Sequence, residues 1–318
     1  MCIRDRDSYE GPGLKSIDSN SFMTASKLFL LFKEERSSVI KPLAVDSQEG
    51  TGSMGDDTAL AVMSKMHRQI YDFFRQQFAQ VTNPPIDSLR EVAVMTLETC
   101  FGPELNIYEE SPEHAKRLVT TSPVLSHRKL QSILSNPYFK AQEINLSFEK
   151  SISLKKAIIN LQNKVVDVVD SGTAIIHLVE DLPDEGKLNI NALLAVGAVH
   201  QKLVKLGKRS DANIIVTSYS ARDTHQIACL IGFGATAVYP SLAYQTILDL
   251  TNRNELKGDP HENCFRYRKG INKGLLKIIS KMGISTISSY RGSQLFEIVG
   301  LGEDIVDLCF TNTTSRVK

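Results

Sequence analysis

The sequence has almost no excess charge, since 37 Lys and Arg residues face 36 Asp and Glu residues and leave a formal net charge of +1. A balance this even gives no indication of binding to nucleic acid or to an acidic membrane surface. Long apolar runs are also lacking: the longest one near the start, residues 28–32, is too short for a membrane span, and the first residues do not have the layout of a signal peptide.

Cysteine is scarce and scattered. The five cysteines are Cys2, Cys100, Cys229, Cys264 and Cys309, and no two have the C-x-x-C spacing. An odd number without that spacing argues against a disulfide framework and against a zinc ribbon. We therefore expect reduced thiols in a cytoplasmic protein, with no metal site.

What the 318 residues do contain is an ordinary globular composition, with 42% hydrophobic and 23% charged residues. The second half alternates between apolar strand-like runs and segments with helical spacing. We expect strands at 142–148, 173–179, 212–216, 235–239 and 284–288, and helices at 154–169, 190–206, 223–231, 242–250 and 268–282. Such alternation favours parallel pairing with right-handed crossovers, so the predicted fold class is α/β, with a (β/α) barrel-like or open parallel sheet.

The first half has a different pattern and is expected to be mostly helical. Helical spacing covers residues 21–41, 60–78 and 86–97, the last with Asp87 or Ser88 as N-cap. The prolines Pro84 and Pro85 end any helix before them. We therefore divide the chain into an extraneous or disordered leader at 1–20, a helical part at 21–140 and a β/α part at 141–318.

Two glycine-rich segments could bind an anion or a nucleotide, but each has a simpler structural interpretation. The segment 232–234 follows a helix and precedes a strand, which is the reverse of a dinucleotide fingerprint, so a helix C-cap and tight turn is favoured. The loop 52–57 could hold an anion through backbone N–H groups, yet it has no P-loop lysine and contains two adjacent acids. A structural loop or an interdomain contact fits that segment better.

The remaining polar candidates are equally ambiguous. His177, His200 and His225 have no metal-ligand spacing and are best interpreted as satisfied structural histidines. Asp181, Asp184 and Glu185 follow a predicted strand and lie where α/β proteins place their sites, although 182–187 also reads as an ordinary polar turn. Arg291 could hold a carboxylate or phosphate, or could equally anchor a neighbouring domain by an ion pair.

Several unbroken strings are more specific than these signals. They are GSMGDDT at 52–58, IYDFFRQQFAQVTNPPID at 70–87, ALLAVGAVH at 192–200, SARD at 220–223, LIGFGA at 230–235, YPSLAY at 239–244, KMGIST at 281–286 and SYRG at 289–292. In order and spacing these blocks resemble the central domain of glutamate synthase large subunits, most closely the bacterial NADPH-dependent type. The resemblance covers roughly residues 22–318.

The resemblance implies a parent enzyme that converts glutamine, 2-oxoglutarate and reducing equivalents into two glutamates. An N-terminal amidotransferase domain would release ammonia, and a later barrel domain would hold FMN and a 3Fe-4S cluster, with NADPH and FAD on the small subunit. The central domain would join the two domains and help wall the ammonia tunnel, without a cofactor of its own. We expect this chain to be a fragment of such an enzyme, inactive alone, with no nucleic-acid or membrane partner.

Two positions depart from the family pattern, which tends to have Ser-Asp-Arg where this chain has Val179-Glu180-Asp181, and a histidine pair where it has His225-Gln226. We predict no catalytic, cofactor-binding or metal-binding residue. The predicted interdomain or tunnel residues are Ser53, Met54, Gly55, Asp56, Asp57, Asn83, Pro84, Pro85, Tyr290, Arg291 and Gly292. The alternatives are a free-standing β/α-barrel enzyme with its own phosphate or flavin site, and a pure interaction module for an amidotransferase.

Overall fold

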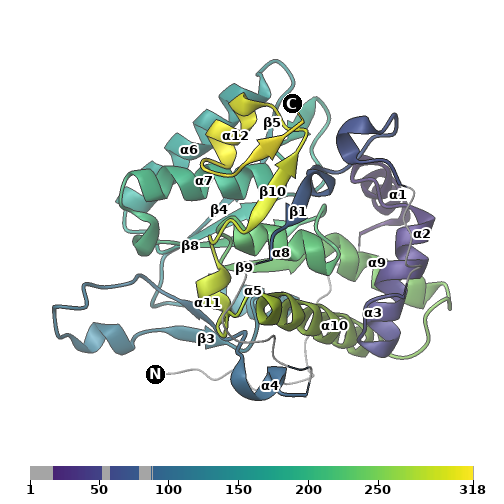
Figure 1. Ribbon diagram of the computed structural model, residues 1–318, viewed down its shortest axis with the longest axis horizontal. Helices are drawn as coiled ribbons and strands as arrows, with labels where there is room; N and C mark the ends of the chain where they lie inside the picture. The colour runs from purple at the N-terminus through teal and green to yellow at the C-terminus, as the bar shows by residue number, and fades with distance from the viewer. Residues whose placement is uncertain (1–16, 52–57, 79–86, 88, 318) are drawn as a thin grey trace.

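The computed structural model describes residues 17–51, 58–78, 87 and 89–317 (Figure 1). A four-stranded sheet with the strand order β4-β6-β8-β9 lies at its centre, and all three strand pairs are parallel. These strands are β4 (Ala141–Asn145), β6 (Ile175–Val179), β8 (Asn213–Ser218) and β9 (Ala237–Pro240). The predicted α/β class with a (β/α) barrel-like parallel sheet is confirmed.

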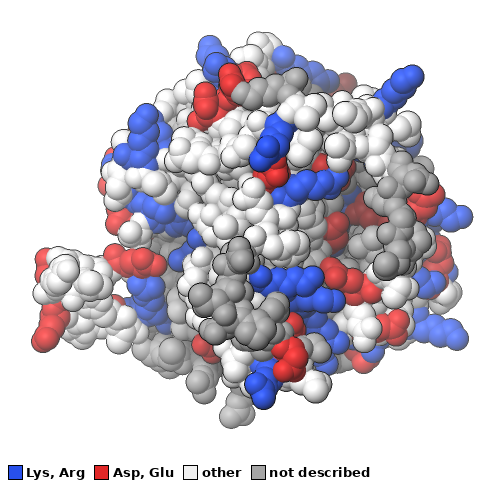
Figure 2. Space-filling view, viewed as in Figure 1, with Lys and Arg blue, Asp and Glu red and all other residues white. Residues whose placement is uncertain are grey.

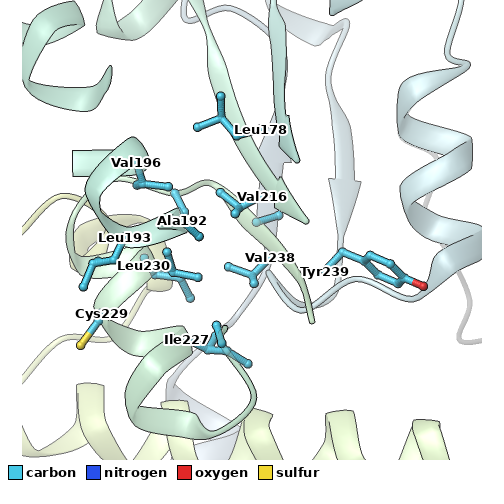
Figure 3. Close-up of a cluster of buried hydrophobic side chains, with 14 of the residues drawn as sticks. Leu178, Ala192, Leu193, Val196, Val216, Ile227, Cys229, Leu230, Val238 and Tyr239 are labelled. Carbon is cyan, nitrogen blue, oxygen red and sulfur yellow. The ribbon is translucent and has the colours of Figure 1, made fainter. Parts of the chain in front are cut away.

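The register of the sheet aligns an apolar row across all four strands. Ile144 pairs with Leu178, Leu178 with Val216, and Val216 with Val238, and all four side chains are buried. Helices cover this face, and Figure 3 shows side chains of α7 and α8 directed at the row. Because both faces of a parallel sheet are normally covered, its strands consist of nearly continuous apolar runs, which is why these strands were predictable. The helices of this part are α6 (Leu154–Asp170), α7 (Ala192–Lys205), α8 (Thr224–Gly232), α9 (Ser241–Asn252) and α10 (Pro260–Lys281).

Four of these helices, α6, α7, α8 and α10, begin at side-chain caps that the sequence supplies, whereas α9 follows Pro240 without one. Asp223 and Gln226 form a capping box at the start of α8, and the Asn191 side chain accepts the N–H of Leu193 at the start of α7. Gly207, after α7, has φ +70°, as expected of a helix-ending glycine. The predicted helices at 154–169, 190–206, 223–231 and 242–250 are therefore confirmed, and the one at 268–282 begins earlier, at Pro260.

The part before residue 140 contains more helices than strands, but they are short. α1, α2 and α3 lie along one side of the molecule (Figure 1). The elements are α1 (Ser19–Leu28), α2 (Lys33–Glu35), the π-helix η1 (Arg36–Ile40), α3 (Lys41–Asp46), the 3₁₀ turns η2 (Ala61–Met63), η3 (Ile70–Phe73) and η4 (Pro112–Ala115), strands β1 (Phe74–Gln76), β2 (Thr99–Phe101) and β3 (Leu118–Thr120), and helices α4 (Glu91–Val94) and α5 (His127–Leu134). The single helix predicted at 21–41 is interrupted after α1, where Leu30 adopts a left-handed φ of 53°.

The helix predicted at 60–78 is wrong. Its last residues form β1, in which Phe74 pairs antiparallel with Ile298 of β10. Phe74 is completely buried among Phe233, Phe296 and Phe310, so tertiary packing overrides the local helical spacing.

The remaining elements are β5 (Ser147–Glu149), β7 (Lys187–Asn189), η5 (Arg209–Asp211), α11 (Ile287–Tyr290), β10 (Phe296–Val299), α12 (Glu303–Cys309) and β11 (Ser315–Arg316).

Three other boundaries also differ from prediction. The strand predicted at 142–148 is split into β4 and β5, and the one at 284–288 is replaced by an isolated bridge between Thr96 and Thr286, followed by α11. The helix predicted at 86–97 is reduced to α4. Asp87 accepts the N–H groups of Leu89 and Arg90 before α4, whereas Ser88 lies outside the described residues.

Candidate functional site

The carboxyl edge of the parallel sheet is the place where α/β proteins usually bind ligands. In this chain the edge is organised around Glu180, the residue directly after β6, whose side chain is completely buried. Its Oε1 accepts the N–H of Ala192 at 2.9 Å, and its Oε2 accepts the N–H groups of Tyr219 at 3.0 Å and Ser220 at 2.9 Å. The hydroxyls of Ser218 and Ser220 also donate to Oε2, both at 2.7 Å.

The ends of three elements bring these groups together. Glu180 directly follows β6, Ser218 ends β8 and Ala192 is the first residue of α7. A carboxylate at a helix N-terminus is favoured, because the free N–H groups and the helix dipole both attract negative charge. Since a carboxylate offers about four lone-pair positions, the donors of this chain already occupy the acceptor capacity of Glu180.

The network extends to the N-terminal part of the chain through Tyr71. The Tyr71 hydroxyl lies 3.1 Å from Ser220 Oγ, and the side chain is completely buried. Burial, followed by the negative charge of Glu180, raises the pKa of Tyr71 well above its usual value. The phenol is therefore neutral and acts as a hydrogen-bonding link.

Arg222 is a second buried group at the same edge. Its guanidinium makes a two-pronged ion pair with Glu35, with Nε–Oε1 2.6 Å and Nη2–Oε2 2.9 Å. Its Nη1 donates to the backbone oxygens of Phe29 and Tyr219, and the Tyr267 hydroxyl donates to the Arg222 carbonyl at 2.6 Å. Such bidentate geometry is among the strongest forms of ion pairing. Arg222 thus holds the segment 29–35 against the end of β8.

Sequence reasoning missed this network. Glu180 was identified only as a departure from the family pattern, and Arg222 only as part of a matching string. The available signal was an acid placed directly after a strand that is apolar at every position except His177. Its partners could not be identified, because Glu35, Tyr71 and Ser220 are far apart along the chain.

The predicted loop 290–292 lies on another part of the molecule. Tyr290 is completely buried and its hydroxyl accepts the amide N–H of Gln76 at 3.0 Å, so it stabilises the fold from inside. Arg291 is partly exposed and faces Glu104 across 3.6 Å, so the carboxylate that it meets belongs to the same chain. Gly292 lies against the His200 ring, so that a side chain at this position would meet it, and the charge of Arg291 acts on the same histidine. The other predicted interdomain residues, Ser53, Met54, Gly55, Asp56, Asp57, Asn83, Pro84 and Pro85, lie outside the described residues.

His200 lies between two arginines. Its Nδ1 accepts the Nε–H of Arg209 at 3.0 Å, and Arg209 also donates to the carbonyls of Ala212 and Gly234. Burial, assisted by the positive charges of Arg209 and Arg291, lowers the pKa of His200 to about 4. Burial and the charge of Arg291 likewise lower the pKa of Arg209 to about 10. His200 is therefore a neutral acceptor at pH 7, as the structural interpretation predicted.

The other two histidines are held by contacts inside the fold, although the buried Nδ1 of His177 makes no hydrogen bond, so the satisfied histidine predicted there is confirmed only for Nε2. His177 is buried, with Nε2 2.8 Å from Thr217 Oγ1 and Nδ1 3.3 Å from Glu143. Burial lowers its pKa, and Glu143 partly offsets that effect. His225 Nε2 lies 3.1 Å from the Tyr71 carbonyl and 3.7 Å from Cys229 Sγ.

The pairing of His225 with Cys229 is not that of a reactive thiol. Cys229 is completely buried, and burial raises its pKa well above the usual value, with the charges of Asp223 and Asp72 adding to the effect. A reactive cysteine needs a lowered pKa and access to its substrate. In the part of the chain that the structure describes, no group of three or more His, Cys, Asp or Glu residues is arranged to hold a metal ion.

The exposed acids after β6 form an ordinary turn. Asp184 pairs with Lys187 at 2.8 Å, which lowers the pKa of that carboxyl. Positive and negative side chains are interspersed over the face shown in Figure 2, in line with the net charge of +1. None of the described helices combines the length and the apolar character needed to cross a membrane.

Comparison with known proteins identifies the family. The profile of the glutamate synthase central domain matches residues 24–302. The chain belongs to the glutamate synthase central domain family. This central domain is 38% identical over 317 residues to ferredoxin-dependent glutamate synthase 2 of Arabidopsis thaliana, covering 95% of this chain and 20% of that protein.

Two further relatives use other electron donors according to their names. The NADPH-dependent large chain of Bacillus subtilis is 35% identical and is matched over 94% of this chain and 20% of its own length. The NADH-dependent enzyme of Saccharomyces cerevisiae is also 35% identical, over 90% of this chain and 14% of its own length. These near-equal identities do not single out the predicted NADPH-dependent type. The central domain spans about a fifth or less of the relatives that it matches.

Among solved structures, the flavin-binding domain of baker's yeast flavocytochrome b2 matches 61% of this chain and 41% of its own length, at 10% identity and a TM-score of 0.36. A likeness this weak carries no argument about function.

Proposed function

We propose that this central domain is a non-catalytic part of a glutamate synthase. It couples a glutamine amidotransferase domain to an FMN- and 3Fe-4S-containing synthase domain and helps wall the passage for ammonia between them. The observation that carries the proposal is the carboxyl edge of the sheet, where Glu180 is saturated by hydrogen bonds from its own chain. A site that bound substrate there would need polar groups that are not already paired.

The parent reaction is the reductive formation of two glutamates from glutamine and 2-oxoglutarate. We propose NADPH as the electron donor, delivered through FAD on a small subunit, and the cytoplasm as the compartment. Support for the compartment comes from the cysteines: Cys100, Cys229, Cys264 and Cys309 are all free thiols.

The physical task of a coupling domain is to keep ammonia away from water and protons between two sites. Rigid walls perform this task, because a closed and largely dry passage needs surfaces that do not rearrange. Buried ion pairs and saturated hydrogen bonds, such as those of Arg222 and Glu180, support such rigidity. We propose Arg291 and Gly292, together with the loops 53–57 and 83–85, as the surfaces that meet the neighbouring domains.

The first test is an assay of the purified chain with glutamine, 2-oxoglutarate and a chemical reductant. We expect no glutamate formation and no flavin absorbance after purification. Glutamate formation by the chain alone would contradict the coupling role. A chain that remains yellow, with an FMN spectrum, would support the free-standing β/α enzyme instead.

The second test addresses coupling directly, in the full-length large chain of Bacillus subtilis with its own central domain replaced by this one. The ratio of glutamate formed to glutamine hydrolysed should stay close to that of the unmodified enzyme, with little ammonia released. Unchanged ammonia capture after deletion of the central domain would refute the role.

A further inference from the structure

An arm made of residues 102–117 joins the antiparallel strands β2 and β3 and projects from the body of the molecule, at the lower left of Figure 1. In the space-filling view it forms a lobe beside the body (Figure 2). None of residues 103–117 is buried. An isolated hairpin is marginally stable at best in water, and this arm buries none of these side chains against the body.

Polar groups within the arm nevertheless fix the shape of its outer turn. The Asn106 side chain accepts the N–H of Tyr108 at 3.1 Å and donates to the Glu109 carboxylate at 3.0 Å. The Glu109 N–H donates to the Asn106 carbonyl at 3.1 Å, and the His114 ring lies 2.9 Å from the Glu109 carbonyl oxygen. A loop that is already ordered loses less conformational entropy when it binds a partner.

Two large apolar side chains project from this ordered turn. Ile107 is 82% exposed and Tyr108 is 89% exposed, and neither belongs to the hydrophobic core. Single exposed apolar residues are normal on a protein surface, but these two are adjacent and are held on a projecting element. Tyrosine is enriched among the residues that dominate protein interfaces, because it supplies a large contact area while only two side-chain torsions become fixed.

The charge next to this apolar pair is negative. Glu109 and Glu110 directly follow Tyr108, and within the described ranges neither carboxylate forms an ion pair. Glu113, closer to β3, is paired with Lys116 at 2.6 Å. Since interfaces match opposite potentials, the surface that complements the end of the arm has an apolar pocket with Lys or Arg at its rim.

The base of the arm adjoins the surface that we propose as interdomain. Glu104 faces Arg291 across 3.6 Å, and its N–H donates to the Ser210 carbonyl at 2.9 Å. A domain that packs against Arg291 therefore comes close to the arm. The chain spans about a fifth or less of the relatives described above, so the partner surface has most of a parent enzyme to come from.

We propose that the arm is a docking element, whose Ile107 and Tyr108 insert into an apolar pocket with a basic rim on an adjoining domain of the parent glutamate synthase. The apolar pair supplies the affinity, and the carboxylates of Glu109 and Glu110 fix the orientation of the contact. This inference rests on the proposed function, because it requires the adjoining domains.

The test is limited proteolysis with a glutamate-specific endoprotease, which cleaves after Glu109 or Glu110, with the products measured by mass spectrometry. The isolated chain is compared with the Bacillus subtilis large chain that carries this central domain in place of its own. We expect cleavage within the arm to be about tenfold slower or more in the full-length protein, because cleavage follows the population of undocked arm. Equal cleavage rates would overturn the proposal. Protection that disappears on dilution would also overturn it, since a second copy would then be the partner.

The double variant Ile107→Ser, Tyr108→Ser removes both apolar side chains. In the full-length protein its arm should be cleaved within about twofold of the rate in the isolated double variant. Both positions are exposed, so the thermal unfolding of the isolated chain should not change. The matched control is Tyr138→Ser, which removes a 63% exposed tyrosine outside the arm and should leave the protection in place. Protection that survives the double variant, or that Tyr138→Ser abolishes equally, would contradict the docking role.

The same samples separate docking from ammonia coupling. The glutamate formed per glutamine hydrolysed is measured beside the cleavage rate. A protected arm in an enzyme that releases ammonia would refute the coupling role alone, and an unprotected arm in a coupled enzyme would refute the docking role alone. A second replacement, limited to residues 102–117, keeps the comparison available if the whole-domain replacement does not fold.

Discussion

Replacing Glu180 by glutamine changes the charge at the centre of the buried network and almost nothing of its shape. The carboxylate accepts N–H groups from Ala192, Tyr219 and Ser220 and two serine hydroxyls. An amide has a single oxygen. If that oxygen takes the place of Oε2, the NH₂ group faces the N–H of Ala192, and two donors then oppose each other in a buried site.

The magnitude follows from these contacts. A buried donor left unsatisfied costs about 1–3 kcal/mol, and each remaining bond weakens from the charged range of about 1.5–3 kcal/mol toward the neutral range of about 0.5–1.5 kcal/mol. Because the serine hydroxyls can rotate to relieve part of the mismatch, we expect the free energy of unfolding to fall by about 3–5 kcal/mol. This is a large share of the roughly 5–15 kcal/mol that a typical domain has.

The assay is urea unfolding at pH 7, followed by far-ultraviolet circular dichroism and by tyrosine fluorescence. The control is Glu185→Gln, which removes the same charge at an exposed position in the turn after β6 and should change stability by less than about 0.5 kcal/mol. A loss below about 1 kcal/mol in Glu180→Gln would refute the reasoning, because it would mean that the carboxylate is not the acceptor on which these donors depend.

Three further predictions follow from other contacts. Arg222→Met should lower the free energy of unfolding by about 3–5 kcal/mol, because Glu35 loses its bidentate partner. A double-mutant cycle with Glu35→Gln should show coupling of more than about 1 kcal/mol, and additive losses would contradict the direct ion pair. Gly234→Ala should cost roughly 2–4 kcal/mol, since the new Cβ would overlap the His200 ring. Gly186→Ala also places a side chain at a positive φ, +86° against +119° at Gly234, but in open space; it should cost only about 1 kcal/mol, so equal losses would exclude the clash. His200 has a folded pKa of about 4, against about 6.5 when unfolded, so the unfolded chain binds the extra proton between these values. The free energy of unfolding should therefore fall as the pH drops from about 6.5 to 4, by an amount of order 2 kcal/mol after solvent screening is allowed for. His200→Gln should remove this pH dependence of the free energy of unfolding. His67→Gln, which changes an exposed histidine, should leave it in place.

The β/α part of the fold could be predicted because its signals are local. The strand β6 is apolar at nearly every position, and α8 begins with Asp223 and Gln226 three residues apart, so each element can be identified without its neighbours. The first part could not be predicted in the same way. β1 exists only because Phe74 pairs with Ile298, more than 200 residues later, and no local pattern contains that partner.

The candidate site was less predictable than the fold for the same reason. The chain positions polar residues after β6 and β8 in a recognisable way, but the sequence alone does not indicate whether they face a ligand or one another. That distinction depends on Glu35 and Tyr71, which come from the least predictable part of the chain. For Arg291 the residue type left a carboxylate, a phosphate and an interdomain ion pair open, and in the structure it faces Glu104 of the same chain, which no motif indicated.

The position of the buried polar groups supports the scaffold role that we propose for this sheet. In a parallel sheet the carboxyl edge collects backbone N–H groups and polar side chains that can bind a ligand. Here Glu180 accepts the N–H groups at the start of α7 and in the turn after β8. Arg222 donates to the Glu35 carboxylate and to two backbone carbonyls. The same chemistry that could hold a substrate therefore joins the N-terminal segments 29–35 and 70–76 to the sheet. Freeing either charge to bind a ligand would remove a partner from the other groups of the network, and a buried charge that loses its partner is strongly destabilising.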